Sequence, residues 1–164
     1  MVFAGLASQS RAAVERVIEK NFTASADARV KIDTCQGAIR IESSPDKQIH
    51  LLVRQTMAVE SQTEADRRLQ DLDLQIEQAA ALISVKARYR RAVRWAWENW
   101  PPVALAFVVK VPRACNLDLI TPEGDITVGS LEGNVVVRTG NGDAHSIENI
   151  GDKDLELIAI ILFE

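Results

Sequence analysis

The 164-residue chain has few of the residues on which most catalytic and metal sites depend. It holds two cysteines and two histidines, and His50 and His145 have no Cys or His at ligand spacing nearby. Cys35 and Cys115 are far apart, which excludes a CxxC redox pair and a zinc knuckle. No GxSxG, HExxH or P-loop motif occurs. The sequence therefore predicts no catalytic residues, no metal and no cofactor.

The two cysteines leave two interpretations open. In an exported protein they could form a disulfide, whereas small buried thiols are the simpler reading of such isolated positions.

The net charge limits the possible partners, because a formal net charge of −4 argues against binding to nucleic acid, whose phosphates attract Lys and Arg.

No apolar run reaches the roughly 20 residues that a membrane-spanning helix needs. The N-terminal residues 1–21 begin with a short apolar stretch followed by Ser and Ala. They are interpreted either as the remnant of a signal peptide whose beginning is missing or as an N-terminal arm. Within them, residues 11–20 predict a short helix of one or two turns.

What the chain does have is a repeat with a period of 18 residues between positions 116 and 151. Thr121, Gly124, Asp125 and Gly133 recur 18 positions later as Thr139, Gly142, Asp143 and Gly151. Short strands and glycine turns at a fixed period are typical of stacked or coiled β architectures. Asp125 and Asp143 are interpreted as solvated turn carboxylates, and a stacked pair that binds a cation is the alternative.

A third copy of the repeat lies much earlier, because residues 30–41 match residues 117–128 position for position. Glycine supplies a sharp turn at positive φ, and stacked threonines hydrogen-bond between adjacent coils. A structural role is therefore predicted for Gly37, Thr121, Gly124, Thr139 and Gly142. The fold class that follows is all-β, a β-solenoid or β-helix-like stack of short strands.

Alternating apolar and polar residues predict further strands at 48–56, 74–78, 82–89 and 103–112. One inserted helix is predicted over residues 62–72. It opens with a capping box, in which Ser61 and Glu64 each satisfy a free donor at the helix end.

An unusual segment, residues 88–100, starts at the end of one predicted strand and leads towards the next, and it is called the Trp/Arg segment here. It contains all three tryptophans of the chain and four of its arginines. As a ligand-binding loop it would stack Trp rings on sugars and hold acidic polymers or lipid headgroups with Arg. As a plain connection it would bury its rings against the sheet. The candidate ligand-binding residues are Arg90, Arg91, Arg94, Trp95, Trp97 and Trp100.

The last residues, 152–164, abandon the repeat and are rich in large apolar side chains. They either cap the open end of the stack, where unpaired edge strands invite aggregation, or are a non-native tail.

The motifs carry a family resemblance. Val111-Pro112, the run from Thr121 to Val128 and the run from Thr139 to Asp143 resemble the bacterial putative-adhesin domain of the DUF4097 type. The resemblance covers roughly residues 22–151, and Ala144, His145 and Ser146 depart from its apolar alternation. It implies an adhesin-like β-solenoid domain that is exported or attached to the cell envelope and has no catalytic residues.

Three hypotheses for function follow. The leading one is a non-enzymatic binding or structural module of the bacterial cell envelope, in which the Trp/Arg segment contacts a glycan, a lipid surface or a protein partner. The second is an assembly protein that forms a homo-oligomer through the C-terminal end of the stack. The third is a carbohydrate-active enzyme that uses Asp125 and Asp143.

Overall fold

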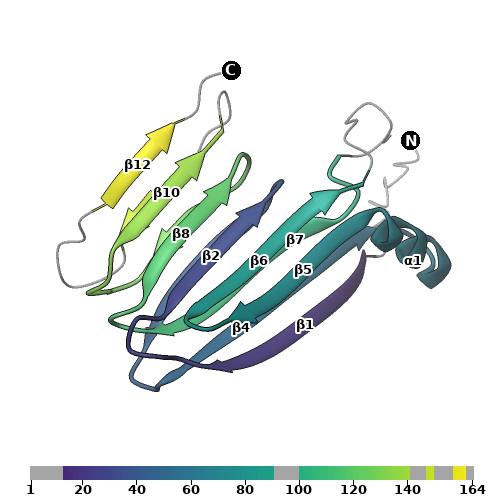
Figure 1. Ribbon diagram of the computed structural model, residues 1–164. Coiled ribbons are helices and arrows are strands. Elements are labelled where there is room, and N and C mark those ends of the chain that lie inside the picture. The colour runs from purple at the N-terminus through teal and green to yellow at the C-terminus, as the bar shows by residue number, and fades with distance from the viewer. Residues whose placement is uncertain (1–12, 91–99, 141–146, 150–156, 162–164) are drawn as a thin grey trace, which may run out of the picture.

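The computed structural model describes residues 13–90, 100–140, 147–149 and 157–161, the last two stretches by their backbone alone. These residues form two six-stranded sheets that pack face to face, with one short helix at one end (Figure 1). The chain is thus mostly β with one helix, as its sequence predicts.

The two sheets follow different orders along the chain. Sheet A contains, in spatial order, β1 (Ala13–Thr23), β4 (Gln48–Ala58), β7 (Ala104–Pro112), β3 (Ala38–Ser44), β9 (Ile126–Val128) and β11 (Ile147–Asn149). Sheet B contains β12 (Leu157–Ile161), β10 (Val135–Thr139), β8 (Asn116–Thr121), β2 (Arg29–Thr34), β6 (Leu82–Tyr89) and β5 (Leu72–Ala79).

The 18-residue period of the sequence is a register between parallel strands. From β8 onward the chain alternates between the sheets, and β10 lies beside β8 with Val135 opposite Leu117. The early copy joins the same stack, because Val30 of β2 also lies opposite Leu117. Beyond β10 the offset grows to 22, with Leu157 of β12 opposite Val135. This longer step accompanies the loss of the glycine turn after Gly142.

The other strands are antiparallel, so both sheets are mixed rather than a uniform stack of coils. β4 pairs in antiparallel fashion with β1 on one side and with β7 on the other. In sheet B, β5 and β6 form an antiparallel hairpin at the end of the sheet. The parallel part therefore begins at β7 in sheet A and at β6 in sheet B.

The helix predicted over residues 11–20 is wrong. Residues 13–23 form β1, an edge strand that pairs along its whole length with β4. Val14, Ile18 and Phe22 pack against the core from this strand. Their spacing of four residues fits one face of a strand as well as one face of a helix, and the sequence alone could not decide between them.

The predicted inserted helix is present as α1 (Gln62–Gln70), two residues shorter than expected. The Ser61 side chain accepts the Glu64 backbone N–H at 3.2 Å, so the N-cap is formed. The Glu64 carboxylate instead binds Arg68, with 2.7 Å between Oε1 and the guanidinium nitrogen. Ala65 is fully buried and attaches the helix to the core.

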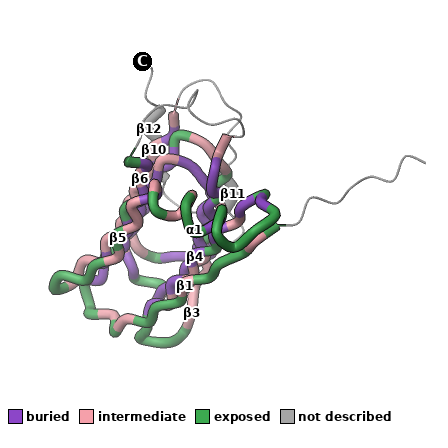
Figure 2. The backbone as a smooth tube through the Cα atoms, turned by 90° about the vertical axis from the view of Figure 1, so that its right-hand side faces the viewer, coloured by how far each residue is buried: buried purple, intermediate pink, exposed green. Residues whose placement is uncertain are grey.

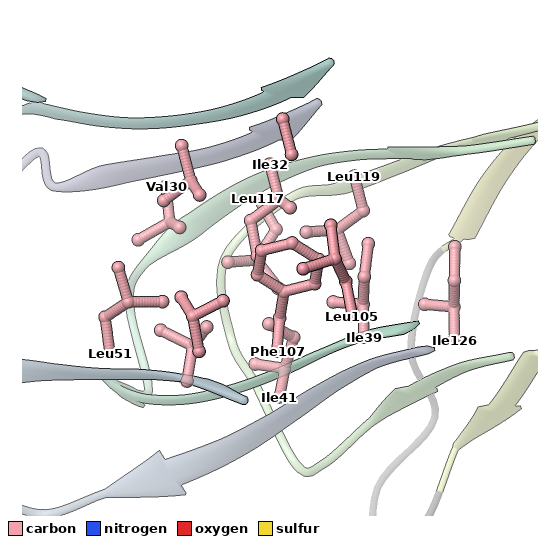
Figure 3. Close-up of a cluster of buried hydrophobic side chains, with 14 of the residues drawn as sticks. Val30, Ile32, Ile39, Ile41, Leu51, Leu105, Phe107, Leu117, Leu119 and Ile126 are labelled. Carbon is pink, nitrogen blue, oxygen red and sulfur yellow. The ribbon is translucent and has the colours of Figure 1, made fainter. Parts of the chain in front are cut away.

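The core lies between the two sheets. Figure 3 shows Val30, Ile32, Leu117 and Leu119 of sheet B facing Leu51, Phe107, Ile39, Ile41 and Ile126 of sheet A. Buried and less buried residues alternate along the strands, as the tube in Figure 2 shows. Each sheet thus has one buried apolar face turned inward and one outer face on which polar side chains are mixed with some partly exposed apolar ones.

Candidate binding site at the strand ends

The turns that follow β2 and β8 are stacked on each other. Thr121 is fully buried, and its hydroxyl lies 3.1 Å from the Gly37 carbonyl of the neighbouring turn and 2.9 Å from the Glu123 carbonyl. The Gly37 backbone N–H donates to the same Glu123 carbonyl at 2.7 Å. Thr139 is buried opposite Thr121, so the threonine column continues into β10.

Two glycines make this stacking possible. Gly37 and Gly124 have φ values of 116° and 125°, a region that side chains rarely adopt. A Cβ on Gly124 would lie 2.5 Å from the Gly37 carbonyl oxygen, and one on Gly37 would lie 2.4 Å from that of Leu105. The backbones therefore touch at this end of the molecule. Gly142 lies outside the described residues.

The same end of the molecule holds both ends of the Trp/Arg segment. At the start of the segment, the hydroxyl of the buried Tyr89 donates to the Val103 carbonyl at 2.7 Å. Gln36, also buried, donates to the same carbonyl at 2.7 Å from its side-chain amide. The Arg90 backbone N–H donates to the Asp71 carbonyl at 2.8 Å. The segment therefore leaves and re-enters the fold at fixed points.

Trp100 closes this anchor at its far side. Its ring meets Tyr89 edge to face, with 5.2 Å between ring centroids, and its Nε1 donates to the Glu123 carboxylate at 3.3 Å. Its ring is half-buried, packed against the core. This last tryptophan thus belongs to the base of the segment, and its peptide bond to Pro101 is cis.

The described residues include only part of the predicted ligand set. Arg90 is exposed and Trp100 is half-buried. Arg91, Arg94, Trp95 and Trp97 lie outside the described residues, as do His145 and Asp143. Asp125 is described and exposed.

Sequence reasoning missed a hollow on the outer face of sheet B, close to this anchor. It has a volume of about 340 Å³ and is lined by Cys35, Ile120 and Pro122, with Arg88 and Arg138 among its other lining residues. We call it the sheet B hollow. A signal for it was present, because Arg88 and Arg138 alternate with core residues of β6 and β10 and must face outward.

A second hollow, of about 350 Å³, lies on the outer face of sheet A. Leu52 and Val108 line it together with the charged side chains Glu19, Asp46 and Lys110. His50 also lines it, and its Nδ1 lies 2.6 Å from the Asn21 side-chain oxygen.

Three groups near the core have shifted pKa values. Burial raises the pKa of Tyr89 to about 12, because the charged phenolate would lose its hydration. Burial likewise raises the pKa of Cys115 to about 11 and that of Cys35 above its usual range. Both thiols are free, so no disulfide joins them. Because of these raised pKa values, both thiols stay protonated at neutral pH and neither acts as a nucleophile there.

Within the described stretches, no three His, Cys, Asp or Glu side chains come together as a metal site. A search of the same residues finds no helix long and apolar enough to cross a membrane.

Comparisons with known proteins show a related fold. The structure is similar to a putative cell adhesion protein from Clostridium sporogenes ATCC 15579, with a TM-score of 0.51 and 7% identity, over 92% of this chain and 68% of that one. It is also similar to a putative adhesin from Bacteroides fragilis NCTC 9343, with a TM-score of 0.39 and 10% identity, over 89% and 61% of the two chains.

A putative lipid binding protein from Parabacteroides distasonis ATCC 8503 follows with a TM-score of 0.34 and 16% identity, over 88% and 62%. This chain thus spans less than two thirds of the latter two proteins. No family model matches the sequence, and no curated protein matches it. At these identities the first similarity shows a shared fold and nothing about activity.

Proposed function

We propose that this chain is a non-enzymatic, adhesin-like binding module of the bacterial cell envelope, and that its Trp/Arg segment contacts an envelope glycan or a lipid surface. The observation that carries the proposal is the anchor formed by Tyr89, Gln36, Val103 and Trp100. It holds the two ends of a segment rich in Trp and Arg at one end of a rigid β-sandwich.

Binding residues are commonly presented by loops on rigid scaffolds, because a fixed base lowers the entropy lost on binding. The anchor uses buried hydrogen bonds and a ring contact, which are costly to break. Tryptophan and arginine suit an envelope ligand, since Trp rings pack on sugar faces and Arg pairs with anionic groups. Fold similarity to a putative cell adhesion protein agrees with this role.

The test is a double variant, Trp95→Ala with Trp97→Ala, measured for co-sedimentation with purified peptidoglycan and with phosphatidylglycerol vesicles. We expect about tenfold weaker binding to at least one of them, at the 1–3 kcal/mol typical of an aromatic binding contact. The matched control is Val17→Ala, an apolar side chain that is 49% exposed on β1 in sheet A. Circular dichroism must be unchanged in both, and a loss of fold in the double variant would refute the ligand role.

The same proposal includes the detailed fold, the family and the location of the protein. We take the parallel strands as short β-solenoid coils, the chain as a DUF4097-type domain, and its location as exported to the envelope. The offset of 18 residues between β8 and β10, and the parallel pairing of β2 with β8 at matching repeat positions, support the solenoid description.

One observation favours the alternative of self-assembly. β12 pairs with β10 on one side and forms the edge of sheet B in the described part of the chain. Its sequence, LIAII, has no charge or proline to discourage pairing with another edge. Sedimentation velocity of the wild type and of Ile158→Lys separates the alternatives, because a monomer in both cases contradicts assembly through this edge.

A further inference from the structure

The outer face of sheet B carries an excess of positive charge over its four adjacent strands β6, β2, β8 and β10. In each strand the residues that alternate with the buried core positions face outward. The basic side chains among them are Arg29, Lys31, Lys86, Arg88 and Arg138, and the acidic ones are Asp33 and Asp118. A basic face of this size is notable in a chain with a net charge of −4.

The two carboxylates orient the arginines. Asp33 accepts from Arg88 at 2.5 Å through its side chain, and its carbonyl accepts from the same guanidinium at 3.2 Å. Asp118 binds Arg138 directly and lies 3.9 Å from the Lys31 ammonium. A guanidinium has five donors, so each arginine keeps further N–H groups for a ligand. Neither Arg29 nor Lys86 forms an ion pair within the described residues, and both are exposed.

The outer face of sheet A differs in its charge balance. Its basic residues Arg40, Arg54 and Lys110 are each paired with a glutamate, at 3.0, 3.3 and 3.9 Å respectively. The excess positive charge therefore lies on these four strands of sheet B, and Asp73 and Glu77 of β5 border it on one side.

The spacing of the arginines suits an extended ligand. Arg88 on β6 and Arg138 on β10 are separated by β2 and β8, and adjacent strands lie about 4.8 Å apart, which gives a span of about 14 Å. The sheet B hollow of about 340 Å³ lies between them, over Cys35, Ile120 and Pro122. A polymer that crosses the strands would thus contact one arginine, then the sheet B hollow with its apolar floor, and then the second arginine.

We propose that this face binds an extended anionic polysaccharide, which crosses β6, β2, β8 and β10 and places one sugar in the sheet B hollow. The site shares Arg88 with the Trp/Arg segment but uses none of its tryptophans, and it goes beyond the function proposed for that segment. Charge complementarity identifies the polymer, and the face itself argues against two other polyanions. The described outward side chains of β6, β2, β8 and β10 include no aromatic ring on which nucleic-acid bases would stack. The face also has no exposed large apolar side chain to enter a membrane, since the described one, Val17, lies on sheet A.

The experiment measures binding of the full chain to alginate, with neutral dextran as the uncharged polymer, by fluorescence anisotropy at about 50 mM and 200 mM salt. We expect binding to alginate alone, and weaker binding at the higher salt because screening reduces each contact. Lys86→Glu with Arg138→Glu should weaken it about tenfold, since charge contacts near the surface contribute up to about 1 kcal/mol each.

The matched control is Lys20→Glu with Lys47→Glu, which changes the net charge equally but lies on the sheet A side of the molecule. It should bind alginate within about twofold of the wild type. No alginate binding, or an equal loss in the lysine control, would overturn the proposal. So would tighter binding to phosphatidylglycerol vesicles or to oligothymidylate than to alginate.

Discussion

Replacing Gly124 by alanine tests how closely the strand-end turns are stacked. The backbone there has φ of 125°, and the new Cβ would lie 2.5 Å from the Gly37 carbonyl oxygen and 2.6 Å from its carbon. An alanine in this region of φ costs about 1–3 kcal/mol. If the Gly37 carbonyl moves, the buried Thr121 hydroxyl loses its hydrogen-bond acceptor, which costs about 1 kcal/mol of stability. We therefore expect a loss of about 3 kcal/mol in the free energy of unfolding.

The assay is urea unfolding followed by circular dichroism, with thermal unfolding as a second readout. For a domain of this size the loss corresponds to a decrease in Tm of roughly 6–12 °C. Gly129→Ala is the matched control, because its Cβ would lie 3.3 Å from the Ile41 carbonyl and its φ is not in the positive region. If Gly124→Ala and Gly129→Ala were equally stable within about 1 kcal/mol, the stacked-turn explanation would be refuted.

Three further predictions concern the buried side chains. With its pKa raised to about 12, Tyr89 stays protonated in the folded protein between pH 10 and 12 while the unfolded chain ionises, so roughly 2–3 kcal/mol of stability present below pH 10 is lost over that range. Urea unfolding at several pH values should show this loss in the wild type and not in Tyr89→Phe. Cys115, 1% exposed and with a pKa near 11, should react with a thiol reagent at pH 8 only after unfolding, whereas the half-buried Cys35 reacts sooner. Phe107→Ala should cost about 3–5 kcal/mol in chemical unfolding, and a cost below about 1 kcal/mol would contradict its central place in the core.

The sequence predicted local structure well where one face of a strand is buried. Alternation of apolar and polar residues located β4, β6 and β7 to within a residue or two. The early repeat copy at residues 30–41 fell on β2 and β3, and the period of 18 became the register of β8 and β10. Helix α1 was recognisable from its Ser61 cap. These features are local, so the residues that create them are neighbours in sequence.

Features that depend on distant partners were not predictable in the same way. The sequence of β1 does not indicate that its partner is β4, and the spacing of its apolar residues fits a helix as well as a strand. The antiparallel pairing of β4 with β7 likewise depends on which edges meet, not on their composition.

The candidate site also has one part that the local sequence predicts and one part that depends on residues distant in sequence. The Trp/Arg segment stood out from its composition, but the role of Trp100 in the anchor depends on Tyr89 and Glu123, which are adjacent only in the fold. The sheet B hollow needs Arg88 and Arg138 to be brought to one face from strands that the chain visits at very different times. A single sequence shows that each of these arginines faces outward, but it does not show that the two lie close together in the fold.

The place of β2 has a consequence for how the chain is synthesised. β2 lies between β6 and β8, both of which come much later in the chain, so neither edge of this strand has a partner when it leaves the ribosome. At about 5–20 residues per second, the roughly 90 residues up to the end of β8 take about 5–18 seconds to translate. During that interval Val30 and Ile32, which end fully buried, are unprotected. The pairing of β2 on both of its edges therefore cannot be completed until β8 has been synthesised.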